Sequence, residues 1–377
     1  MKIKAVWSAA FFLLLPLCLS SQVKLGPWVP EVSGTSFTVN WETPDSQLIR
    51  VEVIKEGTAD TLNFYQTRYG RSLVGNNHSV KVTGLEAGTG YAYRVCGIKV
   101  IDESQPYQLV YAKEENKSEW YHITTLDNRS PLCRFSMVTD IHGNKELYSD
   151  LFSGVASSDM DFMLLIGDMV SYMTSIDVVK DCIISPVGTL LHDVPMLYAR
   201  GNHEGRGQDF WRFEEVSPSR DGKAYYAFRQ GPVAFVVLDC GEDKPDSHPA
   251  YCGNAHFDQY RAEEAVWLEN VVKEKWFRTA PFKICISHIP LYVTEDSWYT
   301  QRRLHEDMTP ILNKAGIDLV LSGHFHRHVY TEAGHSGNRF PVLVHNCDER
   351  LDFVCDGKKA SIKTYDREGR LVHEYEF

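Results

Sequence analysis

Side chains that can ligate metal ions follow the ends of several apolar runs in the later part of the sequence. They are Asp140, His142, Asp168, Asn202, His288, His324 and His326. A pair of divalent metal ions needs a bridging carboxylate and a mixed set of oxygen and nitrogen ligands. Imidazole and carboxylate ligands suit Fe, Mn, Zn, Co or Ni better than Ca²⁺ or a Cu(I) thiolate site. The sequence therefore predicts two divalent or trivalent metal ions, and it leaves their identity open.

Each residue also has an ordinary structural interpretation. A single histidine beside an apolar strand is usually packed, Asp168 could cap a helix, and the pair Gly201-Asn202 could form a turn. The conjunction decides between the interpretations, because five such coincidences at five strand ends are hard to obtain by packing alone.

Apolar runs alternate with helical patterns after residue 131, and this alternation predicts an α/β architecture. The expected strands are 135–139, 162–166, 195–199, 234–238, 283–287 and 318–321, and the expected helices are 145–157, 176–191, 258–276 and 302–315. Ligands of open α/β sheets collect at the carboxyl ends of the strands, so the metal-ligating residues should converge. Gly167, Gly201 and Gly323 would allow the backbone to turn sharply beside the metals.

Residues 22–127 have a different pattern of short, alternating, β-branched and aromatic segments. The expected strands are 36–41, 47–55, 78–82 and 91–98. Such a pattern predicts a small all-β sandwich domain. The polar stretch 126–131 marks the expected boundary to a catalytic domain over residues 132–377.

The motifs resemble those of a known superfamily. Asp140-x-His142, Gly167-Asp168, Gly201-Asn202-His203-Glu204, His288 and Gly323-His324-x-His326 are similar to the motifs of calcineurin-like metallophosphoesterases, over roughly residues 132–347. The segments GPWVPEVSGTSFTVNWET, GLEAGTGYAYRV and YHITTL resemble a fibronectin type III-like module, and more narrowly the N-terminal domain of purple acid phosphatases. The resemblance implies a four-layer αββα sandwich preceded by the small all-β domain.

The resemblance also implies a role for each residue. One metal would be held by Asp140, His142, Asp168 and His326, and the other by Asp168, Asn202, His288 and His324, so that Asp168 bridges the pair. A bridging water or hydroxide would attack the phosphate, and His203 would contact the phosphate and protonate the leaving oxygen. The amide nitrogen of Asn202 would donate to the phosphate.

One departure separates this sequence from purple acid phosphatases, which carry a Tyr three residues after the bridging Asp and lack the histidine of the first motif. Here Ser171 takes the place of that Tyr, and His142 is present. We therefore expect no tyrosinate-to-iron colour.

Four further residues are candidates for substrate binding. Arg200, Arg206 and Arg327 flank the motifs and could bind a distal phosphate or a sugar hydroxyl, or they could face solvent in local ion pairs. Trp298 could stack on a base or a sugar ring, or it could pack under its loop. The formal net charge of −11 argues against a nucleic-acid polymer as partner and leaves a small phosphate ester as the expected substrate. The sequence indicates no partner protein.

The first residues are typical of a signal peptide over residues 1–21. Lys2 and Lys4 precede the apolar stretch 5–19, which is followed by small residues. The alternative is a buried N-terminal helix. No other apolar run is long enough to form a transmembrane helix. We therefore expect an exported protein that is periplasmic, cell-surface or secreted.

Export would permit disulfides. Cys240 with Cys252, and Cys347 with Cys355, would close short loops, whereas Cys285 lies in an apolar run and is expected to be a buried free thiol.

These observations predict an exported dinuclear-metal phosphoesterase that hydrolyses phosphate mono- or diesters, with His203 as general acid. The alternative is a non-catalytic surface binding protein whose phosphoesterase domain is vestigial. The sequence does not separate a monoesterase from a diesterase.

Overall fold

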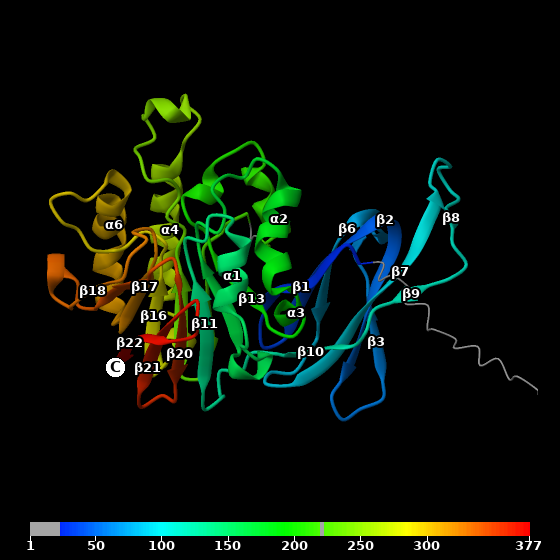
Figure 1. The fold of residues 1–377 in the computed structure, drawn as a ribbon, viewed down its shortest axis with the longest axis horizontal. Coiled ribbons are helices and arrows are strands. Elements are labelled where there is room, and N and C mark those ends of the chain that lie inside the picture. The colour runs from blue at the N-terminus through cyan, green and yellow to red at the C-terminus, as the bar shows by residue number, and fades with distance from the viewer. Residues whose placement is uncertain (1–22, 219–221) are drawn as a thin grey trace, which may run out of the picture.

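The computed structural model describes residues 23–218 and 222–377. The expected signal peptide lies outside the described residues. Two six-stranded sheets and their helices form the larger part of the molecule, and an all-β domain lies at one end of it (Figure 1). The predicted α/β class with an N-terminal all-β domain is confirmed.

The first sheet has the order β13-β12-β11-β20-β21-β22. Its strands are β13 (Met196–Ala199), β12 (Phe162–Ile166), β11 (Cys133–Val138), β20 (Glu349–Cys355), β21 (Ala360–Asp366) and β22 (Leu371–Glu376). The strands β11, β12 and β13 are parallel, whereas β20, β21 and β22 join them in antiparallel fashion. The three antiparallel strands were not expected from the sequence.

The second sheet has the order β14-β15-β16-β17-β19-β18. Its strands are β14 (Tyr226–Gln230), β15 (Val233–Val237), β16 (Phe282–Ile286), β17 (Leu319–Ser322), β19 (Val342–Val344) and β18 (Val329–Thr331). The four central strands are parallel, and β14 and β18 are antiparallel edges. Parallel strands bring their carboxyl ends to one edge of each sheet.

Alternating side chains explain why the two sheets stack. Phe135 and Met137 of β11 belong to one apolar core together with Phe235 of β15, so this core lies between the sheets. Val138 instead faces a second core with the helices of the first sheet, and Val236 faces a third core with the helices of the second sheet. Successive side chains of a strand point to opposite faces, and strands covered on both faces are apolar throughout. The layer order is therefore helix, sheet, sheet, helix.

Three of the four expected helices begin within one residue of the prediction and are shorter or divided, whereas the helix expected over 302–315 begins three residues earlier. The observed helices are α1 (Lys145–Leu151), α2 (Ile176–Ile184), α3 (Gly188–Leu191), α4 (Phe257–Val271), α5 (Lys275–Arg278) and α6 (Tyr299–Ala315). The helix expected over 145–157 stops before Gly154, whose φ is +77°. The helix expected over 176–191 is divided by a 3₁₀ turn that contains Pro186, because proline lacks the N–H that an α-helix requires. The helix expected over 258–276 is divided between α4 and α5.

The N-terminal domain is built around one long strand, β2. Its strands are β1 (Leu25–Val32), β2 (Ser36–Lys55), β3 (Thr61–Phe64), β4 (Thr67–Arg68), β5 (Arg71–Ser72), β6 (Val74–Thr83), β7 (Gly90–Asp102), β8 (Val110–Tyr111), β9 (Asn116–Lys117) and β10 (Tyr121–Thr124). The first half of β2 pairs with β1 and β6, and its second half pairs mainly with β7 and β3. The stretch 126–131, where the boundary is expected, lies in the connection between β10 and β11.

The all-β domain packs directly on the larger domain. Trp28 of β1 is 2% exposed, belongs to the core formed with α1 and α2, and donates from Nε1 to the Val216 carbonyl at 3.3 Å. The Tyr93 hydroxyl donates to the His192 carbonyl at 2.7 Å. Lys180 of α2 is buried and forms ion pairs with Glu42 of β2 and Glu215. The two domains therefore share a core and a buried ion-pair network.

Both predicted disulfides are wrong, because all eight cysteines of the described residues are free thiols. Cys240 is buried whereas Cys252 is exposed. Cys347 lies two residues before β20 and Cys355 is the last of its seven residues, so the length of this strand, roughly 20 Å at about 3.3 Å per residue, keeps them apart. The expectation of a buried free thiol at Cys285 is confirmed. In the described part of the chain, no helix has the length and apolarity needed to cross a membrane.

Candidate metal centre

Five strand ends supply the predicted ligands, three from the first sheet and two from the second. Asp140 follows β11, Asp168 follows β12, and Asn202 follows β13. His288 follows β16, and His324 and His326 follow β17. Because all five strands are parallel within their sheets, their carboxyl ends meet on one side of the sandwich.

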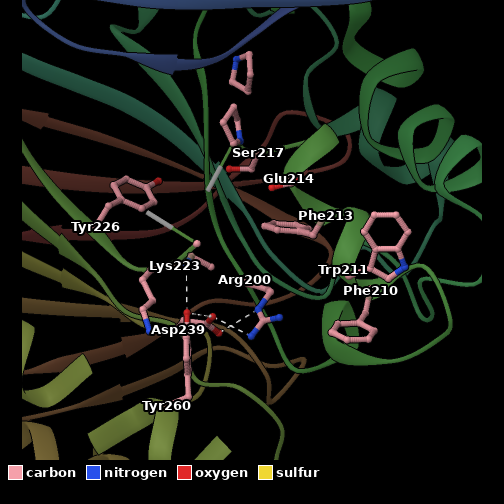
Figure 2. Close-up of a pocket in the computed structure, with 14 residues that line it drawn as sticks. Arg200, Phe210, Trp211, Phe213, Glu214, Ser217, Lys223, Tyr226, Asp239 and Tyr260 are labelled. Carbon is pink, nitrogen blue, oxygen red and sulfur yellow. Dashed lines mark hydrogen bonds and ion pairs between the residues drawn. The ribbon is translucent and has the colours of Figure 1, made fainter. Parts of the chain in front are cut away.

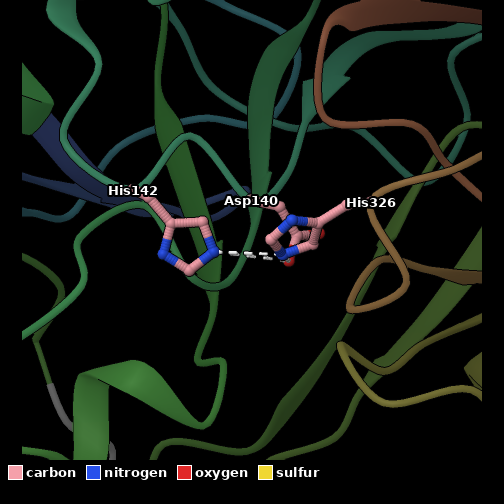
Figure 3. A group of neighbouring side chains, drawn as sticks. All are labelled: Asp140, His142 and His326. Atoms are coloured by element: carbon pink, nitrogen blue, oxygen red, sulfur yellow. Dashed lines mark hydrogen bonds and ion pairs between the residues drawn. The ribbon is translucent and has the colours of Figure 1, made fainter.

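The first group of side chains contains Asp140, His142 and His326, each of which offers one ligand atom within 4.8 Å of the others. The Nε2 atoms of His142 and His326 lie 3.1 Å apart, and His326 Nε2 lies 3.1 Å from Asp140 Oδ1 (Figure 3). At most one of two imidazole nitrogens in such a pair can carry a hydrogen when both rings are neutral. Two imidazole nitrogens and a carboxylate oxygen converge here, and these are the kinds of atoms that bind a transition-metal ion.

The second group contains Asp168, His288 and His324, again with ligand atoms within 4.8 Å of one another. His288 Nε2 lies 3.1 Å from Asp168 Oδ2 and 3.9 Å from Asp140 Oδ1. His288 Nδ1 donates to the Ile166 carbonyl at 2.7 Å, which leaves Nε2 as the free nitrogen. Asp168 also groups with His142, so it stands beside both sets of ligands.

Buried polar atoms without hydrogen-bond partners test whether the site fits metal ions. Asp140 Oδ1, Asn202 Oδ1, His288 Nε2 and His324 Nε2 are all in this state among the described residues. Burying such atoms unpaired costs free energy, and native proteins rarely do it without a ligand or an ion. The donor set of carboxylate, amide oxygen and imidazole therefore fits the two predicted metals.

The pKa shifts of His288 and His324 also fit a site for metal ions. Burial alone would lower the pKa of His288, but the carboxylates of Asp168 and Asp140 raise that pKa to about 10, so they favour a positive charge at this place. Burial lowers the pKa of His324 to about 4, which keeps this imidazole in the neutral form that binds metals.

The backbone at the site is held in an unusual conformation. Asp140, His142, Asp168, His324 and His326 all have φ between +50° and +75°. Non-glycine residues adopt this left-handed region rarely, and such strain is concentrated at functional sites. Gly323 permits the close approach of two loops, because a Cβ there would lie 2.6 Å from Asp140 Oδ2.

His203 stands beside the two groups rather than within the predicted ligand set. Its Nδ1 lies 2.8 Å from the Ser171 carbonyl oxygen, which can only accept, so Nδ1 carries a hydrogen. Its Nε2 lies 3.8 Å from Asp168 Oδ2 and 2.7 Å from Arg206 Nη1. Ser171 itself lies close to the first group, with Oγ 3.4 Å from His142 Nδ1.

The predicted substrate-binding residues fall in different places. Arg206 contacts His203 and forms a two-point ion pair with Glu242 at 2.7 and 2.9 Å. Trp298 is 54% exposed and meets the His324 ring edge to face at 4.9 Å. Arg327 is exposed, with its guanidinium 5.8 Å from the Phe325 ring.

Arg200 is not free to reach the ligand groups. Its guanidinium is paired with Asp239 at 2.8 Å, and Tyr260 also donates to Asp239 at 3.0 Å. These residues line a pocket with Phe210 and Trp211 (Figure 2), and none of the predicted metal ligands lines it.

Sequence reasoning gave Glu204 no role, although it closes the third motif. The side chain is fully buried and accepts the backbone N–H groups of Asp168, Met169 and Gly201 at 2.9 Å each, and the hydroxyl of Tyr198 at 2.8 Å. Glu204 thereby fixes the loops after β12 and β13 against each other. The only feature of the sequence that could have indicated this role is the position of Glu204 two residues after Asn202.

Comparisons with known proteins agree with these observations. Residues 133–328 match the family model described as calcineurin-like phosphoesterase, and residues 22–125 match that of the purple acid phosphatase N-terminal domain. Probable purple acid phosphatase 20 of Arabidopsis thaliana is 25% identical over 287 residues, which are 69% of this chain and 63% of that protein. Serine/threonine-protein phosphatase CPPED1 of Danio rerio is 27% identical over 175 residues, which are 44% of this chain and 54% of that protein. The chain thus spans less than two thirds of the length of these relatives.

Two solved structures resemble almost the whole chain. The purple acid phosphatase PPD1 from yellow lupin (Lupinus luteus) seeds has a TM-score of 0.67 at 13% identity, and the match covers 93% of this chain and 73% of that one. The structure of PhoD has a TM-score of 0.62 at 14% identity, and the match covers 94% and 93% of the two chains. At these identities the likeness shows the fold alone.

Proposed function

Because the chain belongs to the calcineurin-like phosphoesterase family, we propose that it is an exported dinuclear-metal enzyme that hydrolyses phosphate mono- or diesters. The family match confirms the resemblance that the five motifs carry. One observation supports the proposal above the others: buried ligand atoms without hydrogen-bond partners follow four separate strands, β11, β13, β16 and β17.

The proposed mechanism assigns a task to each group of side chains. When bound, two metal ions would activate a water for attack and share the charge of the phosphoryl oxygens. Asp140, His142 and His326 would hold one ion, Asn202, His288 and His324 the other, and Asp168 would hold both. The amide nitrogen of Asn202 would orient the phosphate by donating to one of its oxygens.

His203 would supply a proton to the leaving oxygen from Nε2 when both ring nitrogens are protonated. Its Nδ1 is fixed on the Ser171 carbonyl, so Nε2 is the nitrogen that faces the site. In the structure Nε2 accepts an N–H of Arg206, so Arg206 would turn to the phosphate and free this nitrogen. Arg206 would bind the phosphate ester from the same side, with Glu242 holding its guanidinium. Trp298 would form one wall beside His324.

The proposal is tested by stripping the purified protein with a chelator and reloading it with Mn²⁺, Zn²⁺ or iron. We expect at least about two metal ions per chain and hydrolysis of para-nitrophenyl phosphate or its bis ester. Asp168→Asn should lose metal from both positions, whereas Glu146→Gln, a change at an exposed residue of α1, should change neither binding nor turnover. A protein that binds the metals but hydrolyses neither ester would support the binding-protein alternative.

His203→Ala separates the proton donor from the metal ligands. We expect metal content to stay unchanged and turnover to fall by roughly 10²–10⁴ for esters with poor leaving groups. The loss should be much smaller for para-nitrophenyl esters, because their leaving group needs little protonation. Equal losses on both kinds of ester would contradict the proton-donor role.

Export is proposed on the charged, apolar and small-residue pattern of residues 1–21. Expression of the full chain in a secreting host should give a mature protein whose first residue lies close to Gln22. An intact N-terminus in the cytoplasmic fraction would overturn this part of the proposal.

A further inference from the structure

A second cluster of metal-ligating side chains lies outside the predicted dinuclear centre. His328, His345 and Glu349 each offer one ligand atom within 4.8 Å of the other two. His328 immediately precedes β18, His345 immediately follows β19, and Glu349 is the first residue of β20. The cluster shares no residue with the predicted ligands of the metal pair.

The polar atoms of this cluster are buried and unsatisfied. His328 Nδ1, His345 Nδ1 and Glu349 Oε2 have no hydrogen-bond partner among the described residues. His345 is fully buried, and Glu349 is 5% exposed. A buried carboxylate oxygen without a partner is costly, and a cation is one of the few groups that can compensate it.

The outward-facing atoms of the same side chains do have partners. His345 Nε2 lies 2.8 Å from the Glu349 carbonyl oxygen, which can only accept. Nε2 therefore carries the hydrogen, and Nδ1 presents a lone pair. His328 Nε2 lies 2.7 Å from the Tyr375 hydroxyl, and Asn346 donates to Glu349 Oε1 at 3.2 Å.

Such outer partners orient the ligands of metal sites. The His328 ring is held further by the His373 ring, which stacks on it at 3.7 Å. Three atoms capable of ligation are thus fixed and directed inward, while each side chain is anchored from outside.

We propose that His328, His345 and Glu349 bind a third divalent metal ion, chemically a zinc-type site of two imidazoles and one carboxylate. Three protein ligands of this kind leave a fourth position for water, and the set suits Zn²⁺ or another first-row transition metal. The ion would tie β18 and β19 of the second sheet to β20 of the first. This proposal does not depend on phosphoesterase activity.

The test uses a full-length background in which the predicted pair of metals is removed by Asp140→Asn and Asp168→Asn. After chelation, this protein is equilibrated with Zn²⁺ and desalted, and zinc is measured by mass spectrometry. We expect about one zinc ion per chain. Background protein that is folded by circular dichroism and retains no zinc would overturn the proposal, because His328 Nδ1 would then satisfy Glu349 by a direct hydrogen bond.

Two variants assign the zinc to this cluster. Glu349→Gln in the same background should lose the ion, and His328→Gln, at a less buried position, should lose it as well. His122→Gln is the control, because His122 is exposed in β10 of the all-β domain and is no part of the cluster. Zinc that persists in Glu349→Gln and His328→Gln would mean binding elsewhere.

A crystal of the unaltered chain soaked in Zn²⁺ gives an independent readout. Anomalous density between His328, His345 and Glu349 is expected whether or not the dinuclear centre turns over phosphate esters. Density confined to the seven predicted ligands would overturn the third site while leaving the proposed function intact.

Discussion

Glu204 is a buried carboxylate whose oxygens accept backbone N–H groups from the loops that carry Asp168 and Asn202, and the hydroxyl of Tyr198 in β13. It contacts Asp168 only at the backbone N–H and offers no ligand atom itself, yet it positions Asp168. Removing partners of this kind typically lowers metal affinity or activity by about 10–100-fold.

Glu204→Gln replaces one acceptor oxygen by an N–H donor that would face backbone N–H groups. We expect metal affinity or turnover to fall by about 10–100-fold. Metal titration and steady-state assays check this, with the exposed Glu146→Gln as control. Unchanged metal affinity and rate in Glu204→Gln would show that the loops hold themselves in place.

His78 contributes a pH dependence to folding that is separate from catalysis. It is 5% exposed, its Nε2 lies 2.9 Å from the Thr43 hydroxyl, and its ring lies against Trp41. Burial lowers the pKa of His78 from 6.5 to about 4. Between these pH values the unfolded chain binds a proton at His78 and the folded chain does not. His78 therefore does not lower the free energy of unfolding above pH 6.5, and it lowers this free energy as the pH falls towards 4.

The loss amounts to at most about 3 kcal/mol in the free energy of unfolding. In His78→Gln, unfolding in urea should show a smaller decrease of stability between pH 6.5 and 4 than the unaltered chain shows. His122→Gln, at an exposed position, should leave the pH dependence as it was. Parallel curves for His78→Gln and the unaltered chain would contradict the assignment.

At the scale of elements, strands were more predictable than helices. The run 162–166 coincides with β12, and the other expected strands after residue 131 agree with the structure to within two residues at each end. Strands buried on both faces are continuous apolar runs, which end clearly in the sequence. Helix ends depend on local breaks such as Pro186 and Gly154, and the periodic spacing of apolar residues does not show where these breaks act.

The site was predictable where it depends on strand ends and less so elsewhere. Six of the seven expected ligands, all except Asn202, fall into groups of neighbouring ligand atoms, because they follow parallel strands whose carboxyl ends lie together. The pairing of Arg200 with Asp239 and the acceptor role of Glu204 depend on tertiary contacts between loops, so spacing along the chain gave no measure of them. The same holds for β20–β22, whose pairing with β11 closes the first sheet.

Gly323→Ala tests the close packing of the loop after β17. The added methyl group would meet the side chains of Thr139 and Asp140, which cannot move without displacing a ligand. We expect metal content and turnover to fall at least about 10-fold, since a shift of about 1 Å at a reactive centre has this kind of effect. Gly188→Ala adds the same group where nothing lies within 4 Å, and it should retain both properties.

For the whole molecule, the contact between the two domains is part of the folded core rather than a loose junction. Lys180 lies at its centre, is 1% exposed, and neutralises Glu42 and Glu215 from the two sides. Removing Lys180 would leave the buried Glu42 with Lys24 as its one ion-pair partner among the described residues and Glu215 with Arg212, so the negative charge at the contact would be only partly compensated.

Lys180→Met should therefore lower the free energy of unfolding by about 3–5 kcal/mol. The surface pair of Lys145 with Asp181 is about half exposed on both sides, so Lys145→Met should cost at most about 1 kcal/mol. Denaturant unfolding of the two variants gives the comparison. A loss in Lys180→Met no larger than that in Lys145→Met would show that water reaches the contact.

The two facing sheets meet in one set of ligands, three strand ends from one sheet and two from the other. Metal ions bound to these side chains would cross-link the two sheets, which are otherwise joined by apolar packing. Chelation should then do more than stop turnover: both sheets should become easier to separate together, and amide hydrogens in β12 and β16 should exchange faster by a similar factor. The resistance of this protein to unfolding would accordingly increase with the concentration of metal ions around it.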